Sequence, residues 1–397
     1  MAIQYIDGTH FSELANGKKV LARFDFNVPL DEQLKITDSS RIDLALPTIK
    51  KILASGCERL VLMSHLGRPK GKIDARFSLE PVAKYLAEQL EEEVILTESP
   101  TDRGIKQLLK LQKTKIILLE NIRFDPREES NDPEFAKLLS EYGDVYVMDA
   151  FGAAHRKHAS TYQLNAYFPK KSFAGLLLKN EVAALSKIVD KPKSPYIAIV
   201  GGAKVSDKIK IIEKLLSLVD KLLIGGAMAY PFLKAGGHEI GTSLCSDTDV
   251  NLAKKILGSQ NKGKLVLPKD HIVSAKFAGT PEYIDSIDIP AGKMGLDIGE
   301  ITVAEYQNIL SSAKTVLWNG PMGLFEHADF AKGTLSMATC LANLDAFTLV
   351  GGGDSVSAVK QAGLSHKMSH VSTGGGASLE FLENGSLPGI QALKFGL

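Results

Sequence analysis

The segment GGAKVSDK, residues 201–208, combines glycine and lysine in a way that suits a phosphate group. It follows the apolar run PYIAIV and precedes IKIIEKLLSLV, whose apolar residues recur with helical spacing. A glycine turn that opens a helix lets backbone N–H groups approach a phosphate, and the helix N-terminus adds partial positive charge. Because the spacing is not the P-loop pattern G-x-x-x-x-G-K-[ST], we expect a phosphate site of another type here.

A second segment, GSQNKGKL at residues 258–265, nearly fits the P-loop pattern. Leu265 stands where that pattern has a magnesium-binding hydroxyl. The segment is also predicted to lead from a helix into a strand, which is the wrong direction for a phosphate cradle. We interpret it as a lysine-rich turn.

Glycine follows other predicted strands in the second half of the chain, at Gly225-Gly226, Asn319-Gly320, Gly351-Gly352-Gly353 and Gly374-Gly375-Gly376. One such turn could serve only tight strand–helix packing. Several together favour nucleotide binding. Asp354 adds a carboxylate, which could help to hold a magnesium ion that bridges phosphates or could cap the helix predicted over SVSAVKQ. The two roles are compatible.

In the first half of the chain, the predicted strands are followed by arginine and other polar residues rather than by glycine. Five arginines lie at or near predicted strand ends or in loops, with Asn27, His65 or His155 beside several of them: Arg23, Arg41, Arg68, Arg123 and Arg156. A lone surface arginine is usually solvated or ion-paired. A cluster of guanidinium groups suits phosphate and carboxylate oxygens, so we expect it to grip a small phosphorylated acid. His65, His155 and His158 lack metal-ligand partners at suitable spacing, so zinc is not expected.

The residue types favour phosphoryl transfer over other chemistry. The sequence supports no Ser-His-Asp or Cys-His arrangement and no persuasive carboxylate pair for acid–base catalysis. Phosphoryl transfer needs alignment and charge neutralisation more than covalent help from the protein. A dehydrogenase is disfavoured because no G-x-G-x-x-G follows the first strand.

Short apolar runs that alternate with helical patterns must position these residues. Strands are predicted in segments 18–26, 59–67, 93–99, 115–124 and 144–152 of the first half, and 195–202, 221–226, 264–270, 315–320, 347–354 and 370–376 of the second. Segments 79–93, 133–143 and 171–192 have helical patterns. This alternation indicates βαβ units and parallel sheets. Ligands bind beyond the carboxyl ends of such strands, so we expect one site on each of two sheets.

Length and composition set the outer limits. A chain of 397 residues is long for one core, which predicts two domains. The 47 Lys and Arg residues are balanced by 46 Asp and Glu, so binding to nucleic acid or to an anionic membrane is not expected. Three separated cysteines, no signal-peptide pattern and no apolar run of about 20 residues favour the cytoplasm.

An ordered set of motifs resembles the phosphoglycerate kinase family over the whole chain. The motifs are RFDFNVPL, HLGRP, ENIRF, MDAFGAAHRKHAST, GGAKVSDK, GGAMAYPFLKA, MGLDIG, WNGPMGLFE, GGGDS and STGGGASLEFLE. The resemblance implies an α/β protein of two Rossmann-like three-layer domains with parallel sheets. It implies an N-terminal 3-phosphoglycerate-binding domain (1–172), a hinge helix (173–192), a nucleotide-binding domain (193–380) and a C-terminal segment (381–397) that returns to the first domain.

The resemblance also implies a reaction and its residues. Phosphoryl would pass between 1,3-bisphosphoglycerate and ADP, giving 3-phosphoglycerate and MgATP, with Mg²⁺ as cofactor. The glycerate substrate would be held by Asp25, Asn27, Arg41, His65, Arg68, Arg123 and Arg156. The nucleotide would be held by Lys208, Gly295, Glu326, Gly352, Gly353, Asp354 and Ser355, with Asp354 near the metal. Arg41, Lys204 and the amides of Gly374 and Gly375 would act on the phosphoryl group in flight.

The expected mechanism is domain closure that aligns donor and acceptor without a covalent enzyme intermediate. We expect a cytoplasmic monomer that binds neither nucleic acid nor membrane. Pro231 departs from the family pattern but lies at a predicted helix start, where proline is tolerated. Two alternatives stay open: another kinase that acts on a carboxylate, and a non-catalytic nucleotide- or anion-binding regulator.

Overall fold

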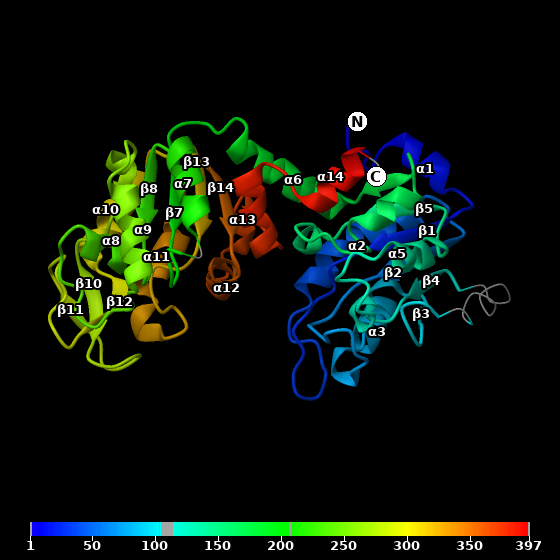
Figure 1. Ribbon diagram of the computed structural model, residues 1–397, viewed down its shortest axis with the longest axis horizontal. Helices are drawn as coiled ribbons and strands as arrows, with labels where there is room; N and C mark the ends of the chain where they lie inside the picture. Colours follow the sequence, from blue (N-terminus) through cyan, green and yellow to red (C-terminus); the bar gives the residue numbers. More distant parts are fainter. Residues whose placement is uncertain (1, 103, 105–113, 207, 396–397) are drawn as a thin grey trace. The chain divides into compact units, whose positions relative to one another are not determined.

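The computed structural model describes residues 2–102, 104, 114–206 and 208–395, and these residues form two compact units (Figure 1). Unit 1 contains Met1–Ala183 together with Ser386–Leu397, and unit 2 contains Ala184–Gly385. Helix α6 (Leu176–Val189) contains the boundary at Ala183. Residue 207 of the lysine motif and residues 396–397 of the C-terminal segment lie outside the described residues.

Unit 1 is built on a six-stranded parallel sheet of order β3-β4-β2-β1-β5-β6. Its strands are β1 (Lys19–Arg23), β2 (Arg59–Met63), β3 (Val94–Leu96), β4 (Ile116–Leu118), β5 (Val145–Met148) and β6 (Ser172–Ala174). Its α-helices are α1 (Thr9–Ala15), α2 (Ser40–Leu53), α3 (Glu80–Leu90), α5 (Pro133–Ser140) and α14 (Pro388–Phe395), with 3-10 turns η1 (Ala75–Phe77), η2 (Ile122–Phe124), η3 (Phe151–Ala153) and η4 (Gln163–Tyr167).

The sheet of unit 1 is buried on both faces. Alternate residues of its strands pack with apolar residues of α1, α2 and α3 in one core cluster. On the other face, Phe168 stacks on Tyr146 of β5, and α14 contacts β6 and η4. Strands buried on both faces explain why the sequence shows continuous apolar runs rather than alternation.

Unit 2 has a six-stranded parallel sheet of order β15-β14-β13-β7-β8-β9. Its strands are β7 (Tyr196–Val200), β8 (Lys221–Ile224), β9 (Leu265–Val266), β13 (Thr315–Asn319), β14 (Phe347–Gly351) and β15 (His370–Val371). Its α-helices are α7 (Ile209–Leu218), α8 (Ala229–Ala235), α9 (Asp247–Leu257), α10 (Glu300–Leu310), α11 (Lys332–Ala342), α12 (Gly353–Gln361) and α13 (Gly375–Asn384), with 3-10 turns η5 (Lys262–Lys264), η6 (Ala328–Phe330) and η7 (Ser365–Lys367).

The sheet order of unit 2 is that of the Rossmann fold, with β7 and β13 at the point where the strand order reverses. Helices α10, α11 and α12 share a core cluster with alternate strand residues, while α7 and α13 contact each other and the strands β7, β8 and β14. The predicted α/β class with two parallel sheets is therefore confirmed.

The structure differs from the predictions in three places. Segment 171–192 was expected to be one helix, but residues Ser172–Ala174 form β6, paired in parallel with β5, before α6 begins at Leu176. A three-stranded antiparallel sheet of order β11-β10-β12 was not predicted. It is formed by β10 (His271–Ser274), β11 (Glu282–Ile284) and β12 (Met294–Ile298). Residues 381–385, expected in the returning segment, belong to unit 2.

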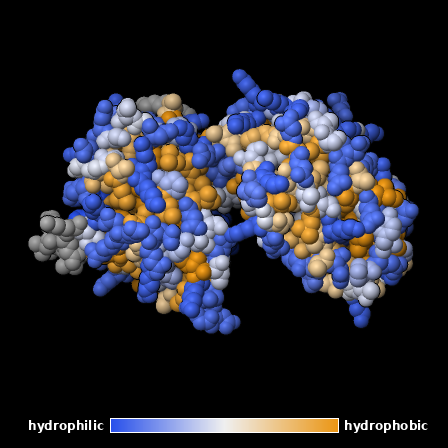
Figure 2. Space-filling model, turned by 180° about the vertical axis from the view of Figure 1, so that it is seen from behind, coloured by the Kyte–Doolittle hydropathy of each residue, from blue (hydrophilic) through white to orange (hydrophobic). Residues whose placement is uncertain are grey.

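The surface agrees with an ordinary globular composition. On the face drawn in Figure 2, hydrophilic and apolar side chains are interleaved over both units. Among the described helices, none is both long enough and apolar enough to cross a bilayer.

Candidate active site

The first candidate site lies in unit 1, where β1, β2 and β4 end at the same edge of the sheet. Asp25 and Asn27 follow β1, His65 follows β2, and Arg123 lies in the 3-10 turn that follows β4. Arg41 comes from the first turn of α2. Parallel strands bring their carboxyl ends together, so residues far apart in the sequence become neighbours here.

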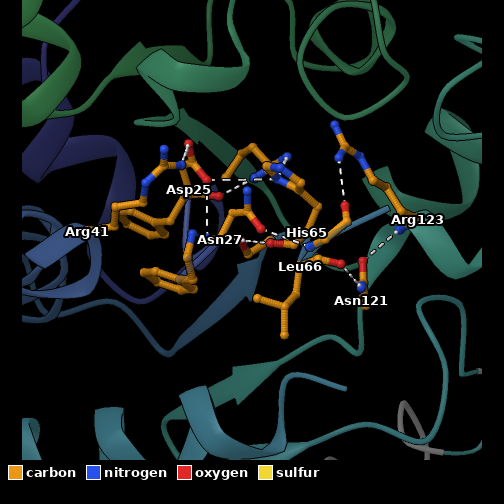
Figure 3. A network of polar contacts seen from close by, with 12 residues as sticks. Asp25, Asn27, Arg41, His65, Leu66, Asn121 and Arg123 are labelled. Atoms are coloured by element: carbon orange, nitrogen blue, oxygen red, sulfur yellow. Dashed lines mark hydrogen bonds and ion pairs between the residues drawn. The ribbon is translucent and has the colours of Figure 1, made fainter. Parts of the chain in front are cut away.

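Asp25 connects two of these residues (Figure 3). Its Oδ2 atom forms an ion pair with Arg41 Nη1 at 2.7 Å, and its Oδ1 atom accepts the backbone N–H of Asn27 at 3.2 Å. The Asp25 side chain is buried, whereas the Arg41 side chain keeps 38% of its surface exposed. Arg41 is thus held by a carboxylate on one side and is still accessible to a ligand.

Arg123 is hydrogen-bonded to the loop that follows the neighbouring strand β2 (Figure 3). Its Nη1 atom donates to Gly67 O at 2.9 Å, and its backbone N–H donates to Asn121 Oδ1 at 3.1 Å. The Asn121 amide in turn donates to Leu66 O at 2.8 Å. Asn27 joins the same segment because its Oδ1 atom accepts the N–H of Gly67 at 2.8 Å. These bonds connect the loops after β1, β2 and β4.

The structure brings together five of the predicted substrate residues: Asp25, Asn27, Arg41, His65 and Arg123. Arg68 directly follows Gly67 and is exposed. Arg156 is also exposed, and its charge acts on Arg123, His155 and His158. These two arginines therefore lie beside the network rather than inside its hydrogen bonds.

The histidines of this region are held neutral. Burial lowers the pKa of His65 well below its ordinary value, and the charges of Arg23, Arg123 and Arg41 lower it further. Burial, followed by the charges of Arg123, Arg23 and Arg156, lowers the pKa of His158 to about 3. At neutral pH the positive charge of the site is therefore carried by guanidinium groups.

Two buried residues of this region were missed by the sequence analysis. Glu128 and Ser160 are fully buried and hydrogen-bonded to each other, and Ser160 Oγ accepts from Arg23 Nε at 3.0 Å. Glu128 lies in the polar stretch DPREESND, whose composition predicts an exposed loop. The sequence contains no signal that would have found it.

The second candidate site lies in unit 2, at the strand reversal between β7 and β13. A cavity of about 420 Å³ is lined there by Gly202, Ala203, Gly226, Ala227, Thr242, Leu244, Phe277, Met294, Gly295, Leu296, Pro321, Gly323, Leu324, Glu326 and Asp354. Leu244 and Phe277 are 58% and 66% exposed, so the cavity offers apolar surface as well as polar groups. An apolar cavity with a few convergent polar groups is the usual form of a small-molecule site.

Lys208 lies at this reversal point. Its ammonium group donates to Gly201 O at 2.8 Å, to Asn319 Oδ1 at 2.7 Å and to Asn319 O at 3.3 Å. These oxygens lie at the carboxyl ends of β7 and β13. Lys208 therefore neutralises the carbonyl dipoles of both strand ends and places positive charge beside the glycine turns.

Two helices begin side by side in this unit. A Cβ atom on Gly375 would lie 3.2 Å from the backbone N of Gly353, so the first residues of α13 and α12 are in close contact. Gly352, the N-cap of α12, has φ of +88°, which favours glycine. The cap is therefore Gly352. The alternative interpretation of Asp354 as the N-cap was wrong, since Asp354 lies in the first turn of α12 and lines the cavity.

The remaining predicted nucleotide and phosphoryl residues have different surroundings. Ser355 is fully buried and accepts the N–H of Gly320. Gly295 packs against the Tyr230 hydroxyl so closely that a Cβ atom would overlap it.

Gly374 donates its N–H to Ser372 Oγ at 3.3 Å, so this amide is already engaged, whereas Gly375 is the first residue of α13. Lys204 is exposed. Burial acts to raise the pKa of Asp249, while hydrogen bonds from Ser246 and Ser206, together with the charge of Lys204, lower it.

Comparison with known proteins decides the family. The family model described as phosphoglycerate kinase matches residues 12–385. A protein named phosphoglycerate kinase from Anaeromyxobacter sp. (strain Fw109-5) is 50% identical over 401 residues, covering 99% of this chain and 100% of the relative. One from Pelodictyon phaeoclathratiforme (strain DSM 5477 / BU-1) is 51% identical over 386 residues, covering 95% and 97%. The chain belongs to the phosphoglycerate kinase family.

Solved structures agree with this result. The phosphoglycerate kinase from Coxiella burnetii superposes with a TM-score of 0.85 at 40% identity, covering 96% of this chain and 97% of that one. The enzyme from Pyrococcus horikoshii OT3 gives a TM-score of 0.84 at 30% identity, covering 99% and 98%. At the level of the family, the expectation of a glycolytic kinase with a carboxyl group as acceptor is confirmed.

The phosphoglycerate kinase family implies a nucleotide with Mg²⁺, and the residues of unit 2 fit such a group. Asp354 and Glu326 both line the cavity. Among the described residues, no group of three or more His, Cys, Asp or Glu side chains could hold a metal ion. Mg²⁺ is commonly bound by one or two carboxylates together with substrate phosphates, so Asp354 suits a metal that arrives with the nucleotide.

One glycine of this site allows a stability prediction. Gly320 has φ of +103°, and a Cβ atom there would overlap Gly201 O and lie 2.8 Å from Lys208 Nζ. We expect Gly320→Ala to lower the free energy of unfolding by about 3 kcal/mol, measured by urea denaturation. Gly363→Ala is the matched control, because Gly363 has φ of +69° but no atom near the added Cβ. That variant should lose only about 1 kcal/mol. Equal losses would contradict the proposed clash.

Proposed function

We propose that this chain transfers a phosphoryl group reversibly between 1,3-bisphosphoglycerate and ADP, giving 3-phosphoglycerate and MgATP. The observation that carries the proposal is that each unit gathers groups suited to an anion at the carboxyl edge of its sheet. Unit 1 presents the guanidinium groups of Arg41 and Arg123 beside His65. Unit 2 presents glycine turns, Lys208 and two adjacent helix starts beside a cavity.

In this proposal unit 1 binds the glycerate substrate. Arg41, Arg68, Arg123 and Arg156 would supply positive charge, while Asp25, Asn27 and His65 would offer hydrogen bonds. Asp25 holds Arg41 by a 2.7 Å ion pair, which restricts the guanidinium fork in advance of binding. A restricted fork loses less side-chain entropy when it binds, which improves alignment.

Unit 2 would bind the nucleotide. The exposed apolar surface of Leu244 and Phe277 suits a base, and Gly295 and Glu326 would line the same pocket. Lys208 and residues 352–355 would face the phosphates. Asp354 would hold Mg²⁺, which when bound supplies charge neutralisation between phosphate groups.

Transfer itself would need no covalent enzyme intermediate. Arg41 and Lys204 would neutralise the charge on the transferring phosphoryl group, together with amides at the start of α13. Because the Gly374 N–H already donates to Ser372, the Gly375 amide is the better placed of the two predicted donors. Water must be excluded, since an exposed acyl phosphate would hydrolyse.

The test of this function is ATP consumption that depends on 3-phosphoglycerate, measured in a coupled assay with magnesium. A panel of other carboxylates in the same assay separates this activity from that of a related kinase. Turnover that is highest with 3-phosphoglycerate supports the proposal. Nucleotide binding without turnover on any carboxylate would favour the non-catalytic regulator.

We further propose that the two units close on the bound substrates, with bending at α6. Closure would align the two anion sites and keep water out. Small-angle scattering tests this with free protein and with protein saturated with 3-phosphoglycerate and a non-hydrolysable MgATP analogue. The radius of gyration should decrease only when both ligands are present. A radius that is unchanged by both ligands would count against closure.

The cytoplasmic location and the monomeric state also stay proposals. Both rest on the resemblance to the family and on the composition of the chain. Sedimentation velocity tests the second, and a species of two or more chains at working concentration would contradict it.

A further inference from the structure

Arg23 lies at the end of β1 with no exposed surface, and each of its side-chain nitrogens has an acceptor. Nε donates to Ser160 Oγ at 3.0 Å, and Nη1 donates to the carbonyl of Phe24. Nη2 contacts His65 Nδ1 at 3.1 Å. Neither Arg23 nor its partner Ser160 is among the residues that the family motifs assign to substrate.

The contact between Arg23 and His65 fixes where the imidazole proton lies. A guanidinium group only donates hydrogen bonds, so His65 Nδ1 must be the acceptor. The competing partner is Asp25 Oδ1, which would accept a proton from Nδ1 but lies 4.0 Å away. That distance is beyond a hydrogen bond. The ring proton therefore lies on Nε2.

Glu128 is connected to the Nε atom of Arg23 through the hydroxyl of Ser160. It is fully buried, and its two carboxylate oxygens accept from Ser160 Oγ at 2.6 Å and from Ser160 N at 2.9 Å. Since Ser160 Oγ accepts from Arg23 and donates to Glu128, the hydroxyl connects the buried cation to the buried anion. Burial raises the pKa of Glu128, while Arg23 and both bonds from Ser160 act against that rise. A buried guanidinium requires such a counter-charge.

Other charged groups around His65 also favour the neutral imidazole ring. Arg23, Arg123 and Arg41 disfavour a protonated ring, as does the nearby His158, and burial has the largest effect on its pKa. His158 Nδ1 lies 3.8 Å from Glu128 Oε1, so Glu128 faces this second histidine as well as Ser160. Asp25 is the one acidic partner within 4.0 Å of His65 among the described ion pairs.

We propose that Glu128 is a positioning residue which, through Ser160 and Arg23, holds His65 as the neutral tautomer with its proton on Nε2. That tautomer leaves one N–H donor for an anionic oxygen of the glycerate substrate. Only the identity of the substrate rests on the proposed function, because the hydrogen-bonded chain exists in the free protein.

The first test is nuclear magnetic resonance of the free protein labelled with [¹⁵N]histidine. His65 is assigned by comparison with His65→Gln, and its tautomer is determined between pH 6 and 8. Ser160→Ala removes the connecting hydroxyl, so Arg23 Nε loses its acceptor and Nη2 is no longer held on Nδ1. We expect the ratio of the Nδ1–H to the Nε2–H form to rise about tenfold. Glu128→Gln should shift the ratio in the same direction. If Glu128→Gln fails to fold, Ser160→Ala alone tests the proposal.

Thr48→Val is the matched control, since it removes another buried hydroxyl of unit 1, one that accepts from Leu176 N at 3.0 Å. This variant should leave the His65 tautomer unchanged. A wild-type His65 with its proton on Nδ1, or with two ring protons in this pH range, would overturn the proposal. So would an unchanged tautomer ratio in Ser160→Ala.

Steady-state kinetics then connects the tautomer to the reaction. The KM for 3-phosphoglycerate should rise about tenfold in Ser160→Ala, with a smaller change in kcat and no change in the KM for MgATP. A shifted tautomer with an unchanged KM would support the hydrogen-bonded chain but would overturn the substrate role proposed for His65. The two measurements therefore separate failure of this inference from failure of the proposed function.

Discussion

Arg41→Ala should lower kcat for phosphoryl transfer by about 100- to 1000-fold, the usual effect of removing one group that stabilises transition-state charge. Arg41 is suited to this role because its side chain is partly exposed and its guanidinium is held by Asp25 at 2.7 Å. A group that acts mainly on the transition state changes kcat more than KM. Steady-state kinetics with 3-phosphoglycerate and MgATP measures both.

The KM for 3-phosphoglycerate should also rise in this variant, because Asp25 is then left without its cation beside an anionic substrate. Arg41→Lys separates the two effects, since it keeps a charge near Asp25 but lacks the planar fork. Compared with Arg41→Ala, we expect Arg41→Lys to have a KM for 3-phosphoglycerate close to that of the wild type but a kcat that is still low. Arg76→Ala is the matched control: it removes an exposed arginine that pairs with Asp74 in the same unit, and turnover should not change. A raised KM alone in Arg41→Ala would make Arg41 a ground-state clamp.

Lys204→Ala is expected to lower kcat by about 100-fold while the KM for MgATP changes little. Lys204 is exposed in the loop between β7 and α7, where an ammonium can reach a phosphoryl group in transit. Lys210→Ala is the matched control, because Lys210 is an exposed lysine in the first turn of α7. Loss of turnover in both variants would point to general charge effects rather than to Lys204.

Lys208→Ala should behave differently from Lys204→Ala. Lys208 is hydrogen-bonded to Gly201 O and to both oxygens of Asn319. Its removal takes this donor from Gly201 O and Asn319 Oδ1, whereas Asn319 O still accepts the N–H of Gly201 at 3.0 Å. We expect about a tenfold higher KM for MgATP together with a lower melting temperature. A kcat defect with unchanged KM and stability would reverse the roles that we give to the two lysines.

The parallel sheets and the strand-end residues could be predicted because they depend on local pattern. Apolar runs of Val, Ile and Leu identify strands buried on both faces, and parallel strands place their carboxyl ends at one edge. Asp25, His65 and Arg123 directly follow such runs and meet as expected. Whether each of them contacts substrate stays a prediction.

Other features depend on tertiary contacts that leave no local pattern. Glu128 comes from a polar stretch yet is buried, with its carboxylate hydrogen-bonded to Ser160, which in turn accepts from Arg23. Strand β11 is mostly exposed and short, so it lacks the continuous apolar run of the main sheets. The engagement of the Gly374 amide by Ser372 could not be predicted either, because a glycine turn shows the position of an N–H group but not its acceptor.

The placement of α14 has a consequence for how the chain is made. This helix contacts β6 and η4, and Gly389 donates its N–H to Ala154 O at 2.9 Å, yet it follows the whole of unit 2 in the chain. A ribosome therefore releases most of unit 1 long before it releases the helix that covers part of it. Until then the nascent unit lacks this helix, so the surface of β6 and η4 that α14 covers is not yet protected. Unit 2, being continuous, can finish folding first.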